Sequence, residues 1–585
     1  MCGIAGLQLR DGHPDEQTLA VLAEALGHRG PDGDGRLVSG NTALLHQRLA
    51  IIDVAGGRQP LAEDGGAALI ANGEIYNYRE LREQMPGVNF RTGSDCEPAL
   101  HLFRKLGTAF VKHLRGMYAI AIYDPREGTL VVTRDPFGIK PLYYAEGDYG
   151  FAFASEPRAL LAAGLGKRAV NDRTRRELLQ LQFTTGAETI FPGIRRVLPG
   201  ETITVTNGRI VSRERHDALP AGGPAEWTEE DALERLDAAL LDSVNVHQRS
   251  DVPYGMFLSG GIDSAAVLSL MSRLNDRPVL AFTAGFPDLD GGDERNAARA
   301  IARALGARHE EVEVTARDFH ELLPQVAAAM DDPAADYAVL PTYKLAAAAR
   351  REVKVILSGE GGDEMFAGYG RYRSVMRPFW FGGRTVRARG IFDGLGVLRI
   401  STTGWRDGIA AAEARASARG GSRLQIAQAV DFADWLPNDL LGKLDRCLMA
   451  HGLEGRTPFL DPAVAQVAFR LPDRLKIRRG LGKWLLRKWL SERVPAADAF
   501  GSKRGFTVPV GAWMAADGAR LGPLVANVPA VREIAEQDRV KRLFVAQGKR
   551  ERFAAWTMLF YALWHRAHIL GKAPDGDLAH CLAES

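Results

Sequence analysis

The sequence has few cysteines, no long apolar run and almost no net charge. Its four cysteines in 585 residues lack the spacing of metal ligands, which argues against a disulfide framework or a zinc module. No apolar stretch reaches the roughly 18 residues that a membrane helix needs, and we expect no signal peptide. A formal net charge of +2 gives no attraction toward nucleic acid or membranes. These absences predict a cytoplasmic protein that acts on small molecules, with neither nucleic acid nor membrane as partner.

The length predicts more than one domain. A chain of 585 residues is too long for a single core, so two to four domains are expected. Residues 216–227 are rich in proline, glycine and alanine without periodicity, as in a linker. Thr228 and Asp231 then form a capping-box pattern that starts a helix. The predicted division is a first domain over residues 2–213, a linker over 214–227 and a second domain over 228–585.

Cys2 is the first candidate nucleophile. Because cysteine is small, we expect removal of the initiator methionine, which would leave Cys2 with both a thiol and a free α-amine. An α-amine has a pKa of about 8, so part of it is neutral at pH 7. A neutral amine beside a thiol can serve as its general base. Taken alone, Cys2 is more simply interpreted as a buried structural cysteine.

The first half alternates short strands with helices. Apolar residues recur with a period of two in residues 43–45, 67–71, 117–123 and 130–133, and helical patterns cover residues 19–26 and 98–106. This order predicts sheets covered by helices. Polar clusters interrupt the strands, and each is a plausible turn by itself; Asn72-Gly73, for example, is a favoured hairpin turn.

Together with Cys2, these clusters make this half resemble the class II glutamine amidotransferases. That family has the four-layer α/β/β/α sandwich of the N-terminal-nucleophile (Ntn) hydrolases, so the resemblance implies this fold for the first domain. The motifs that carry it are residues 29–32, 48–53, 72–77, 92–97, 134–143 and 154–156.

The resemblance also implies a role for each residue of a glutaminase site. The Cys2 thiolate attacks the side-chain amide of glutamine, and Asn72 and Gly73 supply the oxyanion hole. Arg48 clamps the α-carboxylate of glutamine, while Asp95, helped by the 73–74 segment, holds its ammonium. The implied glutamine-binding residues are Arg48, Leu49, Ala50, Ile51, Ile52, Asn72, Gly73, Glu74 and Asp95.

A phosphate-binding loop is predicted early in the second half. In residues 255–264 an apolar strand leads into Ser-Gly-Gly-Ile-Asp-Ser, and an apolar helix follows over 265–270. Glycines let the backbone approach phosphates, and a helix N-terminus offers free N–H groups. No lysine follows the glycines, so this is not a Walker loop. The alternative is an ordinary strand-to-helix turn, but the motif resembles the pyrophosphate loop of ATP pyrophosphatases.

Further strands are predicted at 279–286 and 353–357, with a helix over 294–306. These elements predict a doubly wound parallel sheet that binds ligands at its carboxyl edge. The strand at 353–357 runs into Ser358-Gly359-Glu360-Gly361-Gly362-Asp363-Glu364. Three carboxylates in five residues at a strand end suit magnesium and phosphate.

The complete arrangement resembles the glutamine-hydrolysing asparagine synthetases over nearly the whole chain. The resemblance implies ATP and Mg²⁺ as cofactors, with the metal at Asp263 and Asp363. It places ATP at Leu258, Ser259, Gly260, Gly261, Asp263, Ser264, Ala284, Ser358 and Gly359. It places the acceptor and its adenylate at Glu360, Asp363, Glu364 and Arg456. The implied catalytic residues are Cys2, Asn72, Gly73, Glu360 and Lys503.

This resemblance implies that ATP activates aspartate as an acyl-adenylate, which ammonia from Cys2 reaches through an internal channel. Another carboxylate acceptor stays an alternative, because residues 331–337, Gly455 and Thr457 depart from the commoner family pattern. A non-catalytic protein with the same fold is the rival from another class, and a homodimer stays open.

The arginine-rich segment 371–400 is predicted as a solvated helical insert with an aromatic anchor, the alternative being a lid or partner surface.

Overall fold

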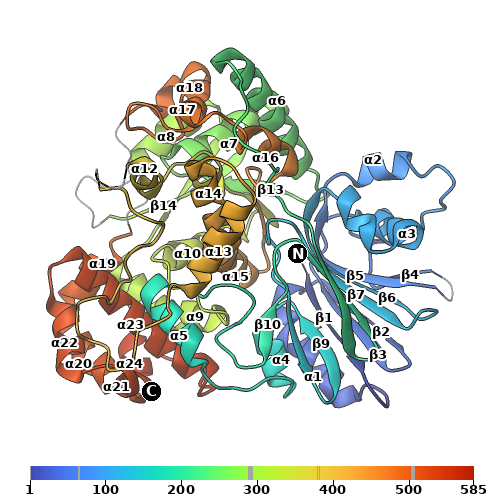
Figure 1. Cartoon of the computed structure of the whole chain (residues 1–585), viewed down its shortest axis with the longest axis horizontal. Helices are drawn as coiled ribbons and strands as arrows, with labels where there is room; N and C mark the ends of the chain where they lie inside the picture. The colour runs from blue at the N-terminus through green and yellow to red at the C-terminus, as the bar shows by residue number, and fades with distance from the viewer. Residues whose placement is uncertain (1, 64–65, 288–293, 379, 381, 502–507) are drawn as a thin grey trace.

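The computed structural model describes residues 2–63, 66–287, 294–378, 380, 382–501 and 508–585. A β-sandwich built from the first half of the chain lies on the right of Figure 1, and the largely helical second half lies on the left. The predicted nucleotide-site residue Lys503 falls outside the described residues.

The sandwich consists of two six-stranded antiparallel sheets. The first has the order β10 (Ile194–Arg196), β8 (Tyr143–Gly147), β9 (Gly150–Ala154), β1 (Gly3–Leu9), β3 (Thr42–Arg48), β2 (Gly33–Ser39). The second has the order β12 (Arg209–Arg215), β11 (Glu201–Thr206), β7 (Thr129–Arg134), β6 (Gly116–Asp124), β5 (Ala68–Ile75), β4 (Leu61–Ala62). Strand β12 therefore runs two residues into the segment predicted as the linker.

Alternation along the strands builds the four layers. Neighbours Ile4 and Ala5 point to opposite faces of β1, as a period of two requires. Ile4 packs in the core between the two sheets, which also contains Ile70 of the other sheet. Ala5 packs outward against α1 (Glu16–Ala25) and α4 (Pro157–Ala162). Helix α3 (Glu97–Leu106) covers the second sheet, so the predicted α/β/β/α sandwich is confirmed.

The second half is organised around a five-stranded parallel sheet, which confirms the predicted fold class. Its order is β15 (Arg308–Glu313), β14 (Leu280–Gly285), β13 (Tyr254–Phe257), β16 (Val355–Leu357), β17 (Glu454–Arg456). Helix α7 (Ile262–Leu274) packs on one face, and α10 (Val339–Ala349) and α15 (Leu441–Met449) pack on the other. Strands β15 and β17 had not been predicted.

The capping box at Thr228 and Asp231 is present and starts α6 (Glu229–His247). Among the described residues of the arginine-rich segment 371–400, α-helix occurs at the start, in α12 (Gly370–Met376). The aromatic anchor was predicted at residues 379–381, and of these Trp380 is 84% exposed and does not supply it. Its neighbours at 379 and 381 lie outside the described residues.

Further helices complete the described parts of both halves. They are α2 (Tyr78–Glu83), α5 (Asp172–Leu181), α8 (Arg295–Ala304), α9 (Ala316–Ala329), α11 (Gly362–Met365), α13 (Asp407–Ala418), α14 (Arg423–Val430), α16 (Pro462–Ala468), α17 (Asp473–Lys476), α18 (Trp484–Arg493), α19 (Val510–Ala516), α20 (Gly518–Asn527), α21 (Pro529–Ile534), α22 (Gln537–Val545), α23 (Lys549–His568) and α24 (Leu578–Ala583).

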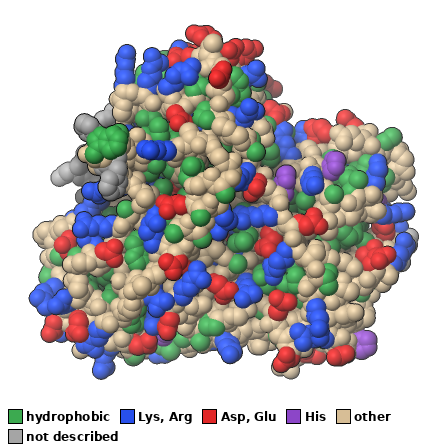
Figure 2. All heavy atoms as spheres, viewed as in Figure 1, with side chains coloured by type: hydrophobic (Ala, Val, Ile, Leu, Met, Phe, Trp, Pro, Cys, Tyr) green, Lys and Arg blue, Asp and Glu red, His purple; other side chains and the backbone are tan. Residues whose placement is uncertain are grey.

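Charge is mixed on the face drawn in Figure 2, where blue and red side chains are interspersed. In the part of the chain that the structure describes, no helix is both long and apolar enough to cross a membrane.

Candidate active site

Cys2 lies at the start of β1 and is 7% exposed. Its Sγ lies 3.9 Å from the carbonyl oxygen of Leu49, and its backbone N–H donates to Asn72 Oδ1 at 3.1 Å. Burial raises the pKa of the Cys2 thiol. The thiol is therefore favoured over the thiolate at rest, and a base must take its proton before it can act as a nucleophile.

The side chain of Asn72 carries an unpaired hydrogen-bond donor. Its Oδ1 receives the Cys2 N–H, whereas its buried Nδ2 has no hydrogen-bond partner among the described residues. Unpaired buried donors are rare in proteins, and one beside a nucleophile suits a negative charge that forms during reaction. Gly73 follows on β5, where a Cβ atom would lie 2.1 Å from the carbonyl oxygen of Met117. The close approach of β6 therefore requires glycine at this position.

The predicted glutamine-binding loop follows β3. Arg48 Nη1 donates to the carbonyl oxygen of Val54 at 2.9 Å, and Nη2 donates to that of Asp53 at 2.6 Å. The guanidinium thus fixes the loop whose residues 49–52 are all buried. Asp95 is also buried and accepts the Ile75 N–H at 2.7 Å. Burial raises the pKa of its carboxyl group.

The structure places Arg456 between the two halves of the chain, and it does not line the acceptor cavity. Its Nη2 lies 3.1 Å from Glu74 Oε1 of the sandwich, and its Nε donates to Glu454 at 2.6 Å. Arg456 is fully buried, and its positive charge is paired with the carboxylates of Glu74 and Glu454 at the boundary between the two halves. Glu74 likewise faces Arg456, and the two link the predicted glutamine site to the parallel sheet.

The predicted phosphate loop joins β13 to the N-terminus of α7. Ser259 Oγ accepts the Gly261 N–H at 3.1 Å and lies 3.0 Å from Ser264 Oγ, so the side chains of the motif brace its backbone. A Cβ atom on Gly359 would lie 2.9 Å from the Cβ of Asp263. The loops after β13 and β16 therefore touch, as expected at the carboxyl edge of a parallel sheet.

A cavity of about 340 Å³ opens where these loops meet. Seven of the nine predicted ATP-binding residues line it, and Gly260 and Gly261 line an adjacent cavity of about 230 Å³. The seven are Leu258, Ser259, Asp263, Ser264, Ala284, Ser358 and Gly359. The structure thus brings together residues from three separate strand ends.

Lys483 is the main residue of this site to which the sequence had given no role. Its Nζ contacts Asp263 and lies 2.7 Å from Asp363 Oδ1. Burial alone would lower the pKa of Lys483, but the two carboxylates raise it to about 12. Lys483 is among the positions that resemble the family, and that resemblance was its signal in the sequence.

The two predicted metal ligands, Asp263 and Asp363, fit Mg²⁺ only in part. No cluster of three or more metal-ligating side chains occurs within the described residues. However, Mg²⁺ at phosphate sites commonly uses one or two carboxylates and takes its other ligands from phosphate and water. Both carboxylates meet Lys483, so one cation already lies where they converge.

The acceptor end of the cavity carries Asp336, Glu360 and Lys443. Lys443 Nζ donates to Asp336 Oδ2 at 2.9 Å and lies 3.6 Å from Glu360 Oε1. Burial raises the pKa of Glu360, against the opposing charge of Lys443. Neither Asp336 nor Lys443 had been assigned a role, because only the fold brings them to Glu360.

Glu364 lies beneath this cavity and does not line it. It is 1% exposed and accepts the Tyr369 hydroxyl at 2.7 Å. Burial, together with the charge of Asp363, raises the pKa of Glu364 to about 8. This carboxyl group is therefore largely protonated at neutral pH and acts as a structural element of the Ser358–Glu364 turn.

The structure joins a four-layer sandwich, with a buried cysteine at the start of its first strand, to a parallel sheet that carries a glycine- and serine-rich loop at its carboxyl edge. Comparison with known proteins gives the family. Residues 235–566 match the family described as asparagine synthase, and residues 1–216 match the glutamine amidotransferase domain. The chain belongs to the asparagine synthase family.

Named relatives cover most of the chain. Asparagine synthetase [glutamine-hydrolyzing] 1 of Bacillus subtilis is 32% identical over 99% of both chains. Asparagine synthetase B [glutamine-hydrolyzing] of Escherichia coli is 29% identical over 84% of this chain and 78% of its own. The amidase chry2 of Gibberella zeae is 30% identical over 64% of this chain and 60% of its own.

Proposed function

We propose that this protein is an ATP-dependent, glutamine-hydrolysing ligase that makes asparagine from aspartate. One observation carries the proposal: a single chain holds a nucleophile beside an unpartnered buried donor, and separately a carboxylate-lined cavity at a phosphate loop. The names of the two relatives called asparagine synthetase support asparagine as the product and hence aspartate as the acceptor.

In the first half-reaction Cys2 hydrolyses glutamine. The α-amine of Cys2, free once the initiator methionine is removed, accepts the thiol proton, and the thiolate attacks the side-chain amide carbon. Asn72 Nδ2 and the Gly73 N–H hold the oxyanion, and one such donor lowers the barrier by about 3 to 4 kcal/mol in other acyl-transfer enzymes. Ammonia leaves, a thioester remains, and water releases glutamate.

In the second half-reaction the β-carboxylate of aspartate attacks the α-phosphorus of ATP, which forms β-aspartyl-AMP and releases pyrophosphate. The loop at Ser259–Ser264, Lys483 and, by family resemblance, Lys503 hold the triphosphate. Asp263 and Asp363 are the residues that would hold Mg²⁺, which neutralises phosphate charge when bound. Glu360 and Asp336 face the acceptor, and their carboxylates suit its ammonium group.

Ammonia then passes from Cys2 to the adenylate inside the protein and displaces AMP. The boundary between the halves is buried, and Lys140 there is 1% exposed with its Nζ 3.3 Å from the carbonyl oxygen of Gly455. Burial lowers the pKa of Lys140.

The alternative is the same chemistry with another carboxylate acceptor. It is favoured by the departure of residues 331–337 from the commoner family pattern, because Asp336 of this segment lines the cavity. The match to a protein named as an amidase agrees with this alternative.

Pyrophosphate release measured with a panel of carboxylates tests the proposal. Aspartate, in the presence of MgATP and glutamine, should stimulate release more than any other acid. Glutaminase activity without aspartate stimulation, combined with strong stimulation by a different acid, would replace the first candidate by the second. Absence of both glutaminase activity and pyrophosphate release would refute both.

A further inference from the structure

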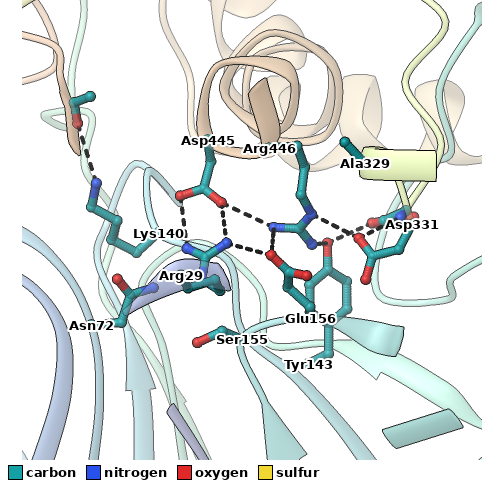
Figure 3. Close-up of polar contacts among 12 residues, drawn as sticks. Arg29, Asn72, Lys140, Tyr143, Ser155, Glu156, Ala329, Asp331, Asp445 and Arg446 are labelled. Atoms are coloured by element: carbon teal, nitrogen blue, oxygen red, sulfur yellow. Dashed lines mark hydrogen bonds and ion pairs between the residues drawn. The ribbon is translucent and has the colours of Figure 1, made fainter. Parts of the chain in front are cut away.

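The two halves of the chain meet in a buried network of ions centred on Arg29, which Figure 3 shows. Arg29 comes from the short helix Gly27–Arg29 in the sandwich and is fully buried. Its Nη1 donates to Glu156 at 2.6 Å and to Asp445 Oδ2 at 2.8 Å, and its Nη2 donates to Asp445 Oδ1 at 3.1 Å. The remaining donor, Nε, points to the carbonyl oxygen of Cys2 at 3.2 Å.

Arg29 therefore joins the nucleophile to the other half of the chain. Asp445 lies on α15, and it grips the guanidinium with both carboxylate oxygens. Such a two-point contact fixes the plane of the guanidinium as well as its position. Because Nε lies in that plane, Asp445 also fixes the direction of the hydrogen bond to Cys2.

Helix α15 also reaches the acceptor cavity. Two residues before Asp445, Lys443 contacts Asp336 and Glu360. One residue after it, Arg446 donates to Asp445 at 3.0 Å and to Asp331 at 2.7 Å. A single rigid helix thus touches the acceptor carboxylates and the arginine that holds Cys2.

We propose that Asp445 is a positioning residue for Cys2, acting through Arg29, so that a side chain of the second half completes the glutaminase site. The inference rests on the proposed function for its assignment of Cys2 as the glutaminase nucleophile. Without the Asp445 carboxylate, the buried guanidinium of Arg29 would keep Glu156 as an acidic partner at hydrogen-bond distance. The direction of its Nε–H toward Cys2 would then no longer be fixed. Misplacement of reacting groups by about 1 Å can reduce a rate about 10²-fold.

The same geometry links the two sites. A ligand that pairs with Glu360 or Asp336 competes for Lys443, and a shift of Lys443 is carried along α15 to Asp445. Binding in the acceptor cavity therefore changes the reactivity of Cys2, with Asp445 as the connecting residue.

The test is Asp445→Asn, which keeps the shape of the side chain and removes its charge. Glutaminase activity and covalent inactivation by the glutamine analogue 6-diazo-5-oxo-L-norleucine are measured without ATP or acceptor. We expect kcat and the maximal inactivation rate to fall about 10²-fold. KM for glutamine and the half-saturating analogue concentration should not change, because Asp445 has no contact with the glutamine-binding loop.

Asp332→Asn is the matched control. Asp332 is a half-buried aspartate that also binds an arginine of the sandwich, Arg196, with both oxygens at 2.7 Å. In the described part of the chain Asp332 forms no hydrogen bond or ion pair with Arg29 or Cys2, so the control should keep the wild-type kcat. An equal loss in both variants would show general damage to the boundary and would overturn the proposal.

Two further measurements keep the test decisive. If Asp445→Asn does not fold, Arg446→Lys keeps the charge but loosens the grip on Asp445, and it should lower kcat without changing KM. MgATP with aspartate should alter the inactivation rate of the wild-type protein and leave that of Asp445→Asn unchanged; an equal response in both proteins would refute the link through Asp445. Failure of the proposed function would appear differently, as a wild-type protein without glutaminase activity.

Discussion

At the scale of single residues, the nucleotide site depends on how opposite charges share a small space. Lys483 lies between Asp263 and Asp363 and stays protonated because both carboxylates are close. A triphosphate entering the adjacent loop brings further negative charge, which the ammonium and a metal ion between the carboxylates would balance. Because two carboxylates and one ammonium leave a net charge of −1, the positive charge of a metal ion would be what lets a triphosphate bind beside them.

Removing one of these charges should disable only the second half-reaction. Asp263→Asn keeps the shape of the side chain but removes a negative charge beside Lys483. We expect pyrophosphate release to fall by about 10²- to 10³-fold, the scale of one preorganised electrostatic contact, with glutaminase activity unchanged. Asp276→Asn, an exposed aspartate just past the other end of α7, is the control and should retain both activities. Normal pyrophosphate release from Asp263→Asn would place the nucleotide elsewhere.

Glu364 should make stability depend on pH. Its pKa of about 8 in the fold lies above the ordinary value of 4.5, so the folded state favours the protonated form. The resulting stabilisation is fully present below about pH 4.5 and is lost as the pH rises toward 8. Glu364→Gln cannot ionise, so its free energy of unfolding should rise relative to wild type by up to about 1.4 kcal/mol per pH unit across this window.

Urea unfolding at pH 5, 6.5 and 8 measures this difference. The exposed Glu230 provides the control, since Glu230→Gln should follow the wild-type pH dependence. A constant difference between Glu364→Gln and wild type at all three pH values would contradict a protonated Glu364.

At the scale of elements, the ends of strands β13, β14 and β16 form the cavity. The sequence predicted these three strands because each is a continuous apolar run, and it predicted the two loops because glycine, serine and carboxylates follow directly. It did not predict β15 or β17. Strand β15 reads Arg-His-Glu-Glu-Val-Glu and β17 has only three residues, so both depend on neighbours in the sheet that local sequence cannot reveal.

Gly361 controls the shape of the loop after β16. Its φ is 89°, and a Cβ atom would lie 2.4 Å from Leu460 Cδ2. Gly361→Ala adds left-handed strain of about 1–2 kcal/mol and a steric clash, so it should displace Glu360 and Asp363. We expect pyrophosphate release to fall severalfold or more while glutaminase activity is kept. Gly306 also has a positive φ, of 66°, but has open space around it. The activity of the control Gly306→Ala should therefore match that of wild type. An equal loss of pyrophosphate release in both variants would mean that backbone strain alone causes it.

At the scale of the whole molecule, the sequence predicted two sites but not how they are joined. Arg29 and Asp445 are 416 residues apart in the chain, and no local pattern connects them. Arg456 was expected beside the acceptor, because the family motif gives its presence but not its direction, and the structure turns it toward Glu74. Such boundary contacts depend on how the sandwich and the parallel sheet pack together, which periodicity and motifs do not encode.

If one chain holds two separate active sites joined by ammonia, Cys2→Ala should separate their activities. The measurement is pyrophosphate release driven by aspartate, with either glutamine or ammonium chloride as nitrogen source, and Cys581→Ala as a control for the loss of a buried cysteine. Cys2→Ala should lose glutaminase activity and glutamine-dependent pyrophosphate release, yet keep wild-type pyrophosphate release with ammonium. Loss of the ammonium-dependent reaction in folded Cys2→Ala, or retained glutaminase activity, would contradict this arrangement of two sites.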